Sequence, residues 1–118
     1  MGTGNNPVLE KSKAFALLII SLYRYLTEEK KEFILSKQLL RSGTSIGANV
    51  REAVHGQSKA DFYSKMFISL KEAAETEYWL ELLHESGSLE ESLFKGAYSD
   101  CKELLSILTA ITKNYSRK

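Results

Sequence analysis

The sequence predicts an all-α protein: one domain over residues 1–118, folded as an antiparallel, up-down-up-down, left-handed four-helix bundle. Proline occurs once, at Pro7, and glycine mostly in short clusters, which leaves long stretches that nothing interrupts. Within these stretches apolar residues recur at steps of three and four, and this spacing forms one stripe along a helix. The connections between the stretches are short, so neighbouring helices are expected to be antiparallel.

The first two helices are expected over residues 7–27 and 32–55. Pro7 suits the first turn of a helix, because the N–H that proline lacks would have no partner there. The apolar stripe of the first helix consists of Phe15, Ile19, Leu22 and Leu26. The stripe of the second helix consists of Leu35, Leu39, Ile46, Val50 and Ala53. Gly56 is a natural stop for this second helix.

The third helix is expected over residues 59–86 and the fourth over residues 89–115. Ser58 and Ser88 stand where an N-cap hydroxyl accepts a hydrogen bond from the first turn, and each has an acidic residue three positions later. Gly87 is expected to end the third helix. The core positions of the third helix are Phe62, Met66, Ser69, Ala73, Thr76, Leu80 and Leu83. Those of the fourth helix are Phe94, Ala97, Cys101, Leu104, Leu108, Ile111 and Tyr115.

Composition narrows the class of protein. Apolar residues at 43% and charged residues at 26% are ordinary for a soluble globular chain. Cys101 is the single cysteine, so no intrachain disulfide can form, and a reducing cytoplasm is the expected location. The longest apolar run, residues 14–20, is far shorter than the roughly 20 residues of a membrane span. We therefore expect no membrane among the partners.

Two Glu-x-x-His segments are the strongest catalytic signal, since carboxylate-bridged metal sites in helical bundles use this spacing. His55 ends the second predicted helix and His84 the third, so an antiparallel hairpin separates them by on the order of 40 Å, at about 1.5 Å per residue. Cys101 lies on an apolar stripe without a nearby base, and residues 43–47 lack the lysine of a phosphate-binding loop. We expect no enzyme, no metal, no cofactor and no small-molecule substrate.

Residues 41–53 concentrate glycine, serine and threonine inside a predicted helix, where each costs up to about 1 kcal/mol relative to alanine. Close packing against a neighbouring helix is the compensation that we expect, because small residues let two backbones approach. Ser45 and Asn49 are four residues apart and are expected to form hydrogen bonds between helices. The predicted helix-packing motif consists of Gly43, Ser45, Ile46, Gly47 and Asn49.

The net charge of +1 is divided unevenly, with +5 on residues 1–71 and −4 on residues 72–118. Such asymmetry indicates either an anionic partner or charge pairing between neighbouring helices. Basic side chains gather on the hairpin of the second and third helices, and there they would bind RNA or DNA through phosphate contacts of little sequence preference. The residues of this predicted surface are Arg41, Arg51, Lys37, Lys59 and Lys65. The alternative for each of them is a solvated ion pair.

The third helix carries more aromatic surface than one narrow core stripe can cover. Some of these rings must lie outside the core, where an exposed aromatic strip is more often a subunit interface than a platform for stacked bases. The predicted interface residues are Tyr63, Phe67, Tyr78 and Trp79.

Three segments of the chain resemble a known family. Residues 38–53 read QLLRSGTSIGANVREA, residues 57–62 read QSKADF, and residues 70–80 read LKEAAETEYWL. They resemble the four helix bundle protein family, which is also known from open reading frames in intervening sequences of bacterial 23S ribosomal RNA genes. This resemblance implies an antiparallel bundle of four helices, often a homopentamer, without enzymatic activity. A related branch, the accessory variability determinant of diversity-generating retroelements, forms a basic pentameric barrel that binds a reverse transcriptase and nucleic acid.

The sequence thus predicts a non-catalytic, homo-oligomeric bundle that associates with nucleic acid or a ribonucleoprotein through the basic hairpin. The alternative is a protein-interaction scaffold without nucleic-acid binding, in which the same residues serve self-assembly alone.

Overall fold

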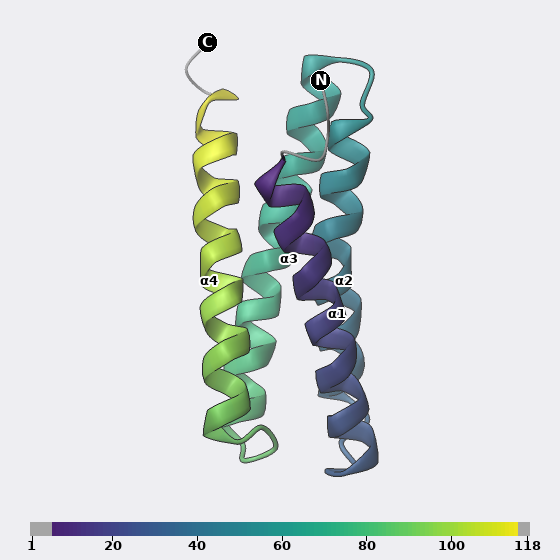
Figure 1. Ribbon diagram of the computed structural model, residues 1–118, viewed down its shortest axis with the longest axis vertical. Helices are drawn as coiled ribbons and strands as arrows, with labels where there is room; N and C mark the ends of the chain where they lie inside the picture. Colours follow the sequence, from purple (N-terminus) through teal and green to yellow (C-terminus); the bar gives the residue numbers. More distant parts are fainter. Residues whose placement is uncertain (1–5, 116–118) are drawn as a thin grey trace.

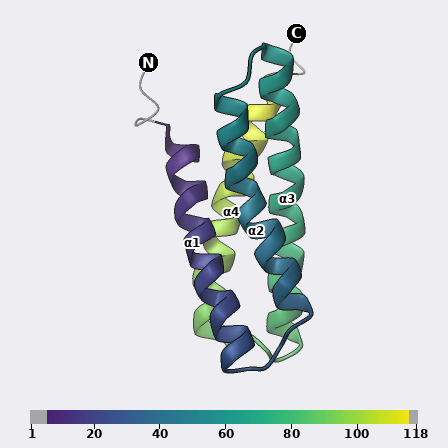
Figure 2. The same cartoon turned by 90° about the vertical axis from the view of Figure 1, so that its right-hand side faces the viewer.

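The computed structural model describes residues 6–115, which form four helices and no strand (Figure 1). The helices are α1 (Pro7–Glu28), α2 (Leu35–Val54), α3 (Lys59–Glu85) and α4 (Glu91–Lys113). Figures 1 and 2 show that each helix runs opposite to the one before it, along a body measuring 46 × 25 × 21 Å. The predicted all-α four-helix bundle is confirmed. No helix in residues 6–115 is both long enough and apolar enough to span a membrane.

The helices form a closed ring in which each one packs on two others. α2 lies between α1 and α3, and α4 lies between α3 and α1. The seam between α1 and α4 is the least extensive of the four, and the view in Figure 2 shows α1 standing beside α2 at one side of the bundle. The α2–α3 hairpin is therefore the best-packed half of the molecule.

The core is formed by the stripes that the sequence predicts. Every helix contributes fully buried apolar side chains, among them Ile19, Leu39, Ile46, Leu80 and Leu108. Four of the predicted core residues are only partly buried at the margin of this core, namely Leu35, Phe62, Phe94 and Ile111.

The prediction that Tyr115 lies in the core is wrong. α4 ends at Lys113, so Tyr115 no longer follows the helical stripe and is largely exposed. Its ring lies on the outside of the bundle, with its centroid 5.1 Å from that of Tyr63 and 6.1 Å from that of Phe67.

The second helix begins three residues later than predicted, at Leu35 instead of residue 32. The Glu32 carboxylate folds over the helix start and accepts hydrogen bonds from the backbone N–H groups of Ile34 (3.2 Å), Leu35 (2.9 Å) and Ser36 (2.7 Å). Glu32 thus acts as a cap in front of α2. Lys31 has a φ of 56°, the left-handed conformation that turns the chain from α1 into this cap.

The Ser58 cap of α3 is confirmed, because its hydroxyl accepts a hydrogen bond from the Asp61 N–H at 3.0 Å. The Ser88 cap is wrong, since α4 begins at Glu91 and its N-cap residue, Glu90, makes no side-chain cap bond. The Ser88 N–H donates instead to the Leu83 carbonyl at 2.9 Å, and so does the N–H of Leu89. Leu89 is buried, and the positive φ of 91° at Gly87 allows the chain to fold back so that it reaches the core.

Candidate interaction surfaces

The small residues of α2 lie against α1. A Cβ atom at Gly43 would lie 2.8 Å from Ile19 Cγ1, and one at Gly47 would lie 3.2 Å from the Ser12 carbonyl oxygen. At both positions α1 occupies the space that a side chain would need. Gly43 and Ile46 are buried, so this part of the predicted motif does lie at a close helix contact.

Ser45 and Asn49 make a different bond from the one predicted. The Asn49 side-chain amide donates to the Ser45 carbonyl oxygen at 2.9 Å and to Ser45 Oγ at 3.2 Å, so both bonds stay within α2. The expected bond between helices is absent for this pair because both side chains lie away from the core stripe, at partly exposed positions.

Hydrogen bonds between α2 and α3 come instead from buried hydroxyl groups. Ser69 Oγ donates to the Ile46 carbonyl oxygen at 2.9 Å. The Thr76 hydroxyl lies 2.8 Å from Ser42 Oγ and 2.7 Å from the Glu72 carbonyl oxygen. The sequence signal for this seam was the presence of Ser69 and Thr76 on a core stripe, where a hydroxyl needs a partner.

The five predicted phosphate-binding residues do not form one patch. Arg41 pairs with Glu72 (3.3 Å) and Glu75 of α3, and Lys65 pairs with Glu52 of α2 at 2.9 Å. These two cations therefore already have carboxylate partners, which is the alternative that the sequence left open. The other three are exposed and have no acidic partner within residues 6–115: Lys37 in the first turn of α2, Lys59 in that of α3, and Arg51.

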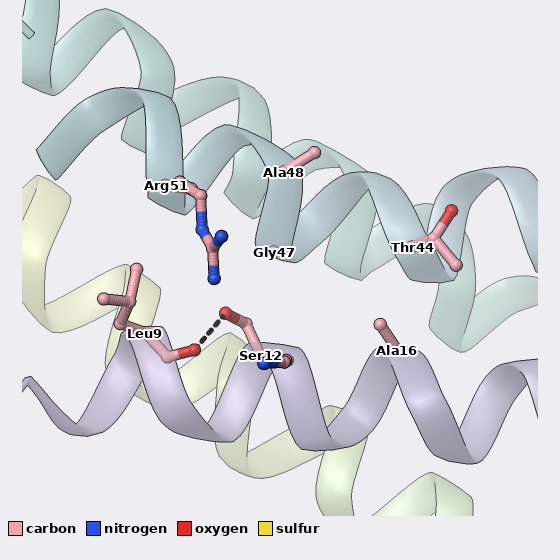
Figure 3. Close-up of a pocket in the computed structure, with 8 residues that line it drawn as sticks. Leu9, Ser12, Ala16, Thr44, Gly47, Ala48 and Arg51 are labelled. Carbon is pink, nitrogen blue, oxygen red and sulfur yellow. Dashed lines mark hydrogen bonds between the residues drawn. The ribbon is translucent and has the colours of Figure 1, made fainter. Parts of the chain in front are cut away.

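Arg51 belongs to a groove between α1 and α2 with a volume of about 260 Å³ (Figure 3). Each helix contributes four residues at positions i, i+3, i+4 and i+7, and the lining residues are Leu9, Ser12, Lys13, Ala16, Thr44, Gly47, Ala48 and Arg51. Lys13 and Arg51 are the only charged residues among them, and Figure 3 shows the Arg51 guanidinium lying across the groove toward Ser12. Lys13 was not predicted from the sequence, because it lines the same groove as Arg51 only through the packing of α1 against α2.

The four predicted interface aromatics divide into two pairs. Phe67 and Tyr78 are 40% and 53% exposed, and they belong to a stripe of exposed residues at steps of three and four. We call this stripe the outer face of α3, and it consists of Ser64, Phe67, Lys71, Ala74 and Tyr78. Tyr63 and Trp79 flank it as half-buried rings, Trp79 donating its indole N–H to Glu75 at 3.2 Å.

A second aromatic feature lies between α3 and α4, and the sequence analysis did not identify it. The Tyr98 hydroxyl donates to Glu81 Oε2 at 2.8 Å and lies 3.3 Å from Glu77 Oε2, with the Lys102 ammonium 5.5 Å from the ring centroid. The bond to Glu81, with burial and the negative charge of Glu81, raises the pKa of Tyr98 to about 12. The available signal was the four-residue spacing of the two glutamates, which places both on one side of α3.

The histidines and the cysteine lie apart from one another. His55 caps the end of α2, whereas His84 lies in the last turn of α3 at the opposite end of the hairpin. The His84 ring stacks on Phe94 with a centroid distance of 4.0 Å, and its Nε2 is 2.8 Å from Glu91 Oε1. Cys101 is fully buried, and burial raises the pKa of its thiol to about 12. Nowhere in residues 6–115 do three His, Cys, Asp or Glu side chains gather as a metal site would require.

Comparison with known families agrees with this architecture. The family of the 23S rRNA-intervening sequence protein matches residues 4–110. The chain belongs to this family. A solved structure from Bacteroides thetaiotaomicron VPI-5482, described as a protein with unknown function from the S23 ribosomal protein family, is 51% identical to this member, with a TM-score of 0.88. The match covers 90% of this chain and 98% of the other. A comparison with curated proteins found no match.

Proposed function

We propose that this member of the 23S rRNA-intervening sequence protein family is a non-catalytic scaffold, which assembles with copies of itself through the outer face of α3. The observation that carries this proposal is the exposure of Phe67 and Tyr78 on one side of α3, while the opposite side of the same helix is buried in the core. A four-helix bundle buries one side of each helix. A second apolar side therefore stays exposed unless another molecule covers it.

The outer face of α3 has the composition of an interface core. Its residues follow the three- and four-residue steps of a helix–helix seam, and Ala74 between the two aromatics lets another helix approach closely. Lys71 is its only charged residue, in keeping with the depletion of charge at interface cores.

Neighbouring rings extend this apolar surface at both of its ends. The centroid of Tyr115 lies 6.1 Å from that of Phe67, which extends the surface toward the end of α4. The rings of Tyr78 and Trp79 are 5.3 Å apart, which extends it around α3 on the other side. The surface is thus long enough to accept a helix of a second copy. The number of copies that the family resemblance implies is five.

Sedimentation analysis of the full chain tests this proposal. For the wild-type chain we expect an assembly with a mass several times the 13.3 kDa of one chain. The variant Phe67→Glu/Tyr78→Glu should form a much smaller assembly, because two buried charges without partners oppose association. The control is Leu17→Glu, which places a charge at a residue of α1 that is 60% exposed and distant from this face. Circular dichroism should show equal helix content in all three proteins. A wild-type chain that stays at 13.3 kDa at every concentration contradicts the proposal.

Nucleic-acid binding is a second candidate, favoured by the two unpaired cations of the α1–α2 groove. Lys13 and Arg51 have no carboxylate partner within residues 6–115, so both are free to contact phosphates. Arg41, by contrast, is already neutralised by Glu72 and Glu75.

Binding of an RNA and a DNA oligonucleotide at increasing salt concentration tests this candidate. We expect Arg51→Glu to weaken binding and to reduce the slope of log affinity against log salt by about one or more. Arg41→Glu should have the smaller effect, and the double variant should resemble Arg51→Glu. Absence of binding even in dilute buffer would leave self-assembly as the sole function proposed.

A further inference from the structure

Arg41 belongs to α2 and lies outside the outer face of α3, yet hydrogen bonds connect it to an aromatic ring beside that face. Arg41 Nη1 lies 3.3 Å from Glu72 Oε1, and Arg41 Nη2 pairs with Glu75 Oε2. The same oxygen, Glu75 Oε2, accepts the indole N–H of Trp79 at 3.2 Å. One carboxylate oxygen of α3 thus links a cation of α2 to the single tryptophan of the chain.

Trp79 in turn supports Tyr78, the more exposed of the two rings on the outer face. The Trp79 ring packs against core residues, and its centroid lies 5.3 Å from that of Tyr78, in the tilted arrangement that aromatic pairs favour. Tyr78 is 53% exposed and makes no other ring contact and no hydrogen bond among residues 6–115. The orientation of Tyr78 therefore depends on where Trp79 is held.

Glu75 would oppose self-assembly if Arg41 did not pair with it. Its side chain is 36% exposed and stands directly after Ala74, at the edge of the outer face, so a second copy seated on Tyr78 would remove it further from water. A carboxylate that loses water without a partner raises the free energy of association, and a paired guanidinium offsets much of this cost.

We propose that Arg41 is a positioning residue for the self-assembly described above, and this inference rests on that proposed function. Arg41 acts through Glu75 in two ways. It fixes the carboxylate that orients Trp79 behind Tyr78, and it balances the charge of that carboxylate next to the contact. Because the two rings are held in place before a second copy arrives, association orders few side chains.

Sedimentation of Arg41→Ala tests the effect on assembly. We expect the association constant to fall by about tenfold or more, since the loss of one partner leaves Glu75 charged and unpaired at the contact. Lys65→Ala is the matched control, because Lys65 and Glu52 form another ion pair between α3 and α2, at 2.9 Å, and Glu52 accepts no bond from an aromatic ring. This control should keep the wild-type association constant.

The double variant Arg41→Ala/Glu75→Gln separates positioning from a general loss of stability. Glutamine carries no charge, and its amide oxygen can still accept the indole N–H of Trp79. The double variant should therefore recover most of the association that Arg41→Ala loses. An ion pair that only stabilised the bundle would not be restored by the removal of its second partner.

The fluorescence of Trp79 reports its position within a single copy. In the Phe67→Glu/Tyr78→Glu chain, which lacks the contact between copies, Arg41→Ala should increase the quenching of this fluorescence by acrylamide and lower its anisotropy. Lys65→Ala in the same chain should change neither signal. Both replacements should shift the urea midpoint of this chain by similar, small amounts, because each removes one partly exposed ion pair between α2 and α3.

Three results overturn the role of Arg41 while leaving the proposed function intact. The wild-type chain assembles and Arg41→Ala associates as strongly as Lys65→Ala, the double variant recovers no association, or Arg41→Ala leaves the quenching of Trp79 unchanged. A wild-type chain that stays single at every concentration contradicts the proposed function itself, and the role of Arg41 in assembly with it.

Discussion

Gly43 lies so close to Ile19 that a Cβ atom in its place would be 2.8 Å from Ile19 Cγ1 and 2.9 Å from Cγ2. Ile19 is fully buried, and its branched Cβ leaves it few alternative rotamers. The side chain cannot move away, so the distance between α1 and α2 depends on the absence of a side chain at residue 43.

Gly43→Ala should therefore destabilise the bundle, although alanine is the better helix former. We expect the free energy of unfolding to fall by up to about 2 kcal/mol, after the helix-propensity gain of about 1 kcal/mol is deducted from an overpacking cost of about 1–3 kcal/mol. Urea denaturation followed by circular dichroism measures this change. Gly96→Ala in α4 is the matched control, since nothing lies within 4 Å of the added Cβ, and this variant should gain about 0.5–1 kcal/mol. Equal stabilisation by both substitutions would contradict the close contact.

Ser69→Ala should cost about 0.5–1.5 kcal/mol, because Ser69 Oγ donates the buried hydrogen bond that joins α3 to the Ile46 carbonyl of α2. The control is Ser21→Ala, which makes the same replacement at an exposed position of α1. Both variants gain the same helix propensity, so the difference between their urea midpoints isolates the bond between helices. No difference would mean that this bond contributes nothing to stability.

Much of the fold could be predicted from the sequence because the signals are local. Helix bounds follow from Pro7, from Gly87 and from stripes that repeat every three or four residues, and the structure places all four helices within three residues of prediction. The bonds of Glu32 to backbone N–H groups were missed because they depend on the φ of 56° at Lys31, which no periodicity reveals.

The surfaces were harder to predict than the helices. Arg41 pairs with Glu72 and Glu75, which follow it in the sequence by 31 and 34 positions. These ion pairs depend on how α2 and α3 are rotated about their axes. A stripe of apolar residues predicts which side of a helix is buried, but it does not state which charged residue of the next helix lies opposite.

Glu32→Ala should loosen the start of α2. The variant loses one carboxylate that accepts three backbone N–H bonds, and we expect a loss of about 1–2 kcal/mol in the free energy of unfolding. Hydrogen exchange should show faster exchange of the amides of Ile34, Leu35 and Ser36, with the centre of α2 unaffected. Glu29→Ala is the control, since Glu29 is exposed and its side chain makes no hydrogen bond or ion pair within residues 6–115.

Cys101 should be almost unreactive in the folded protein. Its side chain is fully buried and its thiol lies 3.4 Å from the Ala73 carbonyl oxygen, which accepts its weak hydrogen bond. Burial, followed by the negative charge of Glu77, raises the pKa of Cys101 to about 12, so the reactive thiolate is rare at pH 8. With an aromatic disulfide reagent we expect labelling at least about a hundredfold slower in buffer than in urea. Rapid labelling of the folded chain would contradict the burial of this residue.

The raised pKa of Cys101 also gives the stability of the bundle a pH dependence of definite sign. In the unfolded chain the thiol loses its proton near its ordinary pKa of 9.0, whereas in the folded chain it keeps it up to about 12. The unfolded state therefore binds fewer protons above pH 9, and stability is lost as the pH rises from about 9 to 12. Between pH 8 and pH 10 the Cys101 thiol should lower the free energy of unfolding by about 1–2 kcal/mol. The raised pKa of Tyr98 lowers stability less than Cys101 does over this pH range. Urea denaturation at both pH values measures this loss, and Cys101→Ala should reduce it although the variant is less stable at pH 8. An equal loss in both proteins would show that the thiol is not the group responsible.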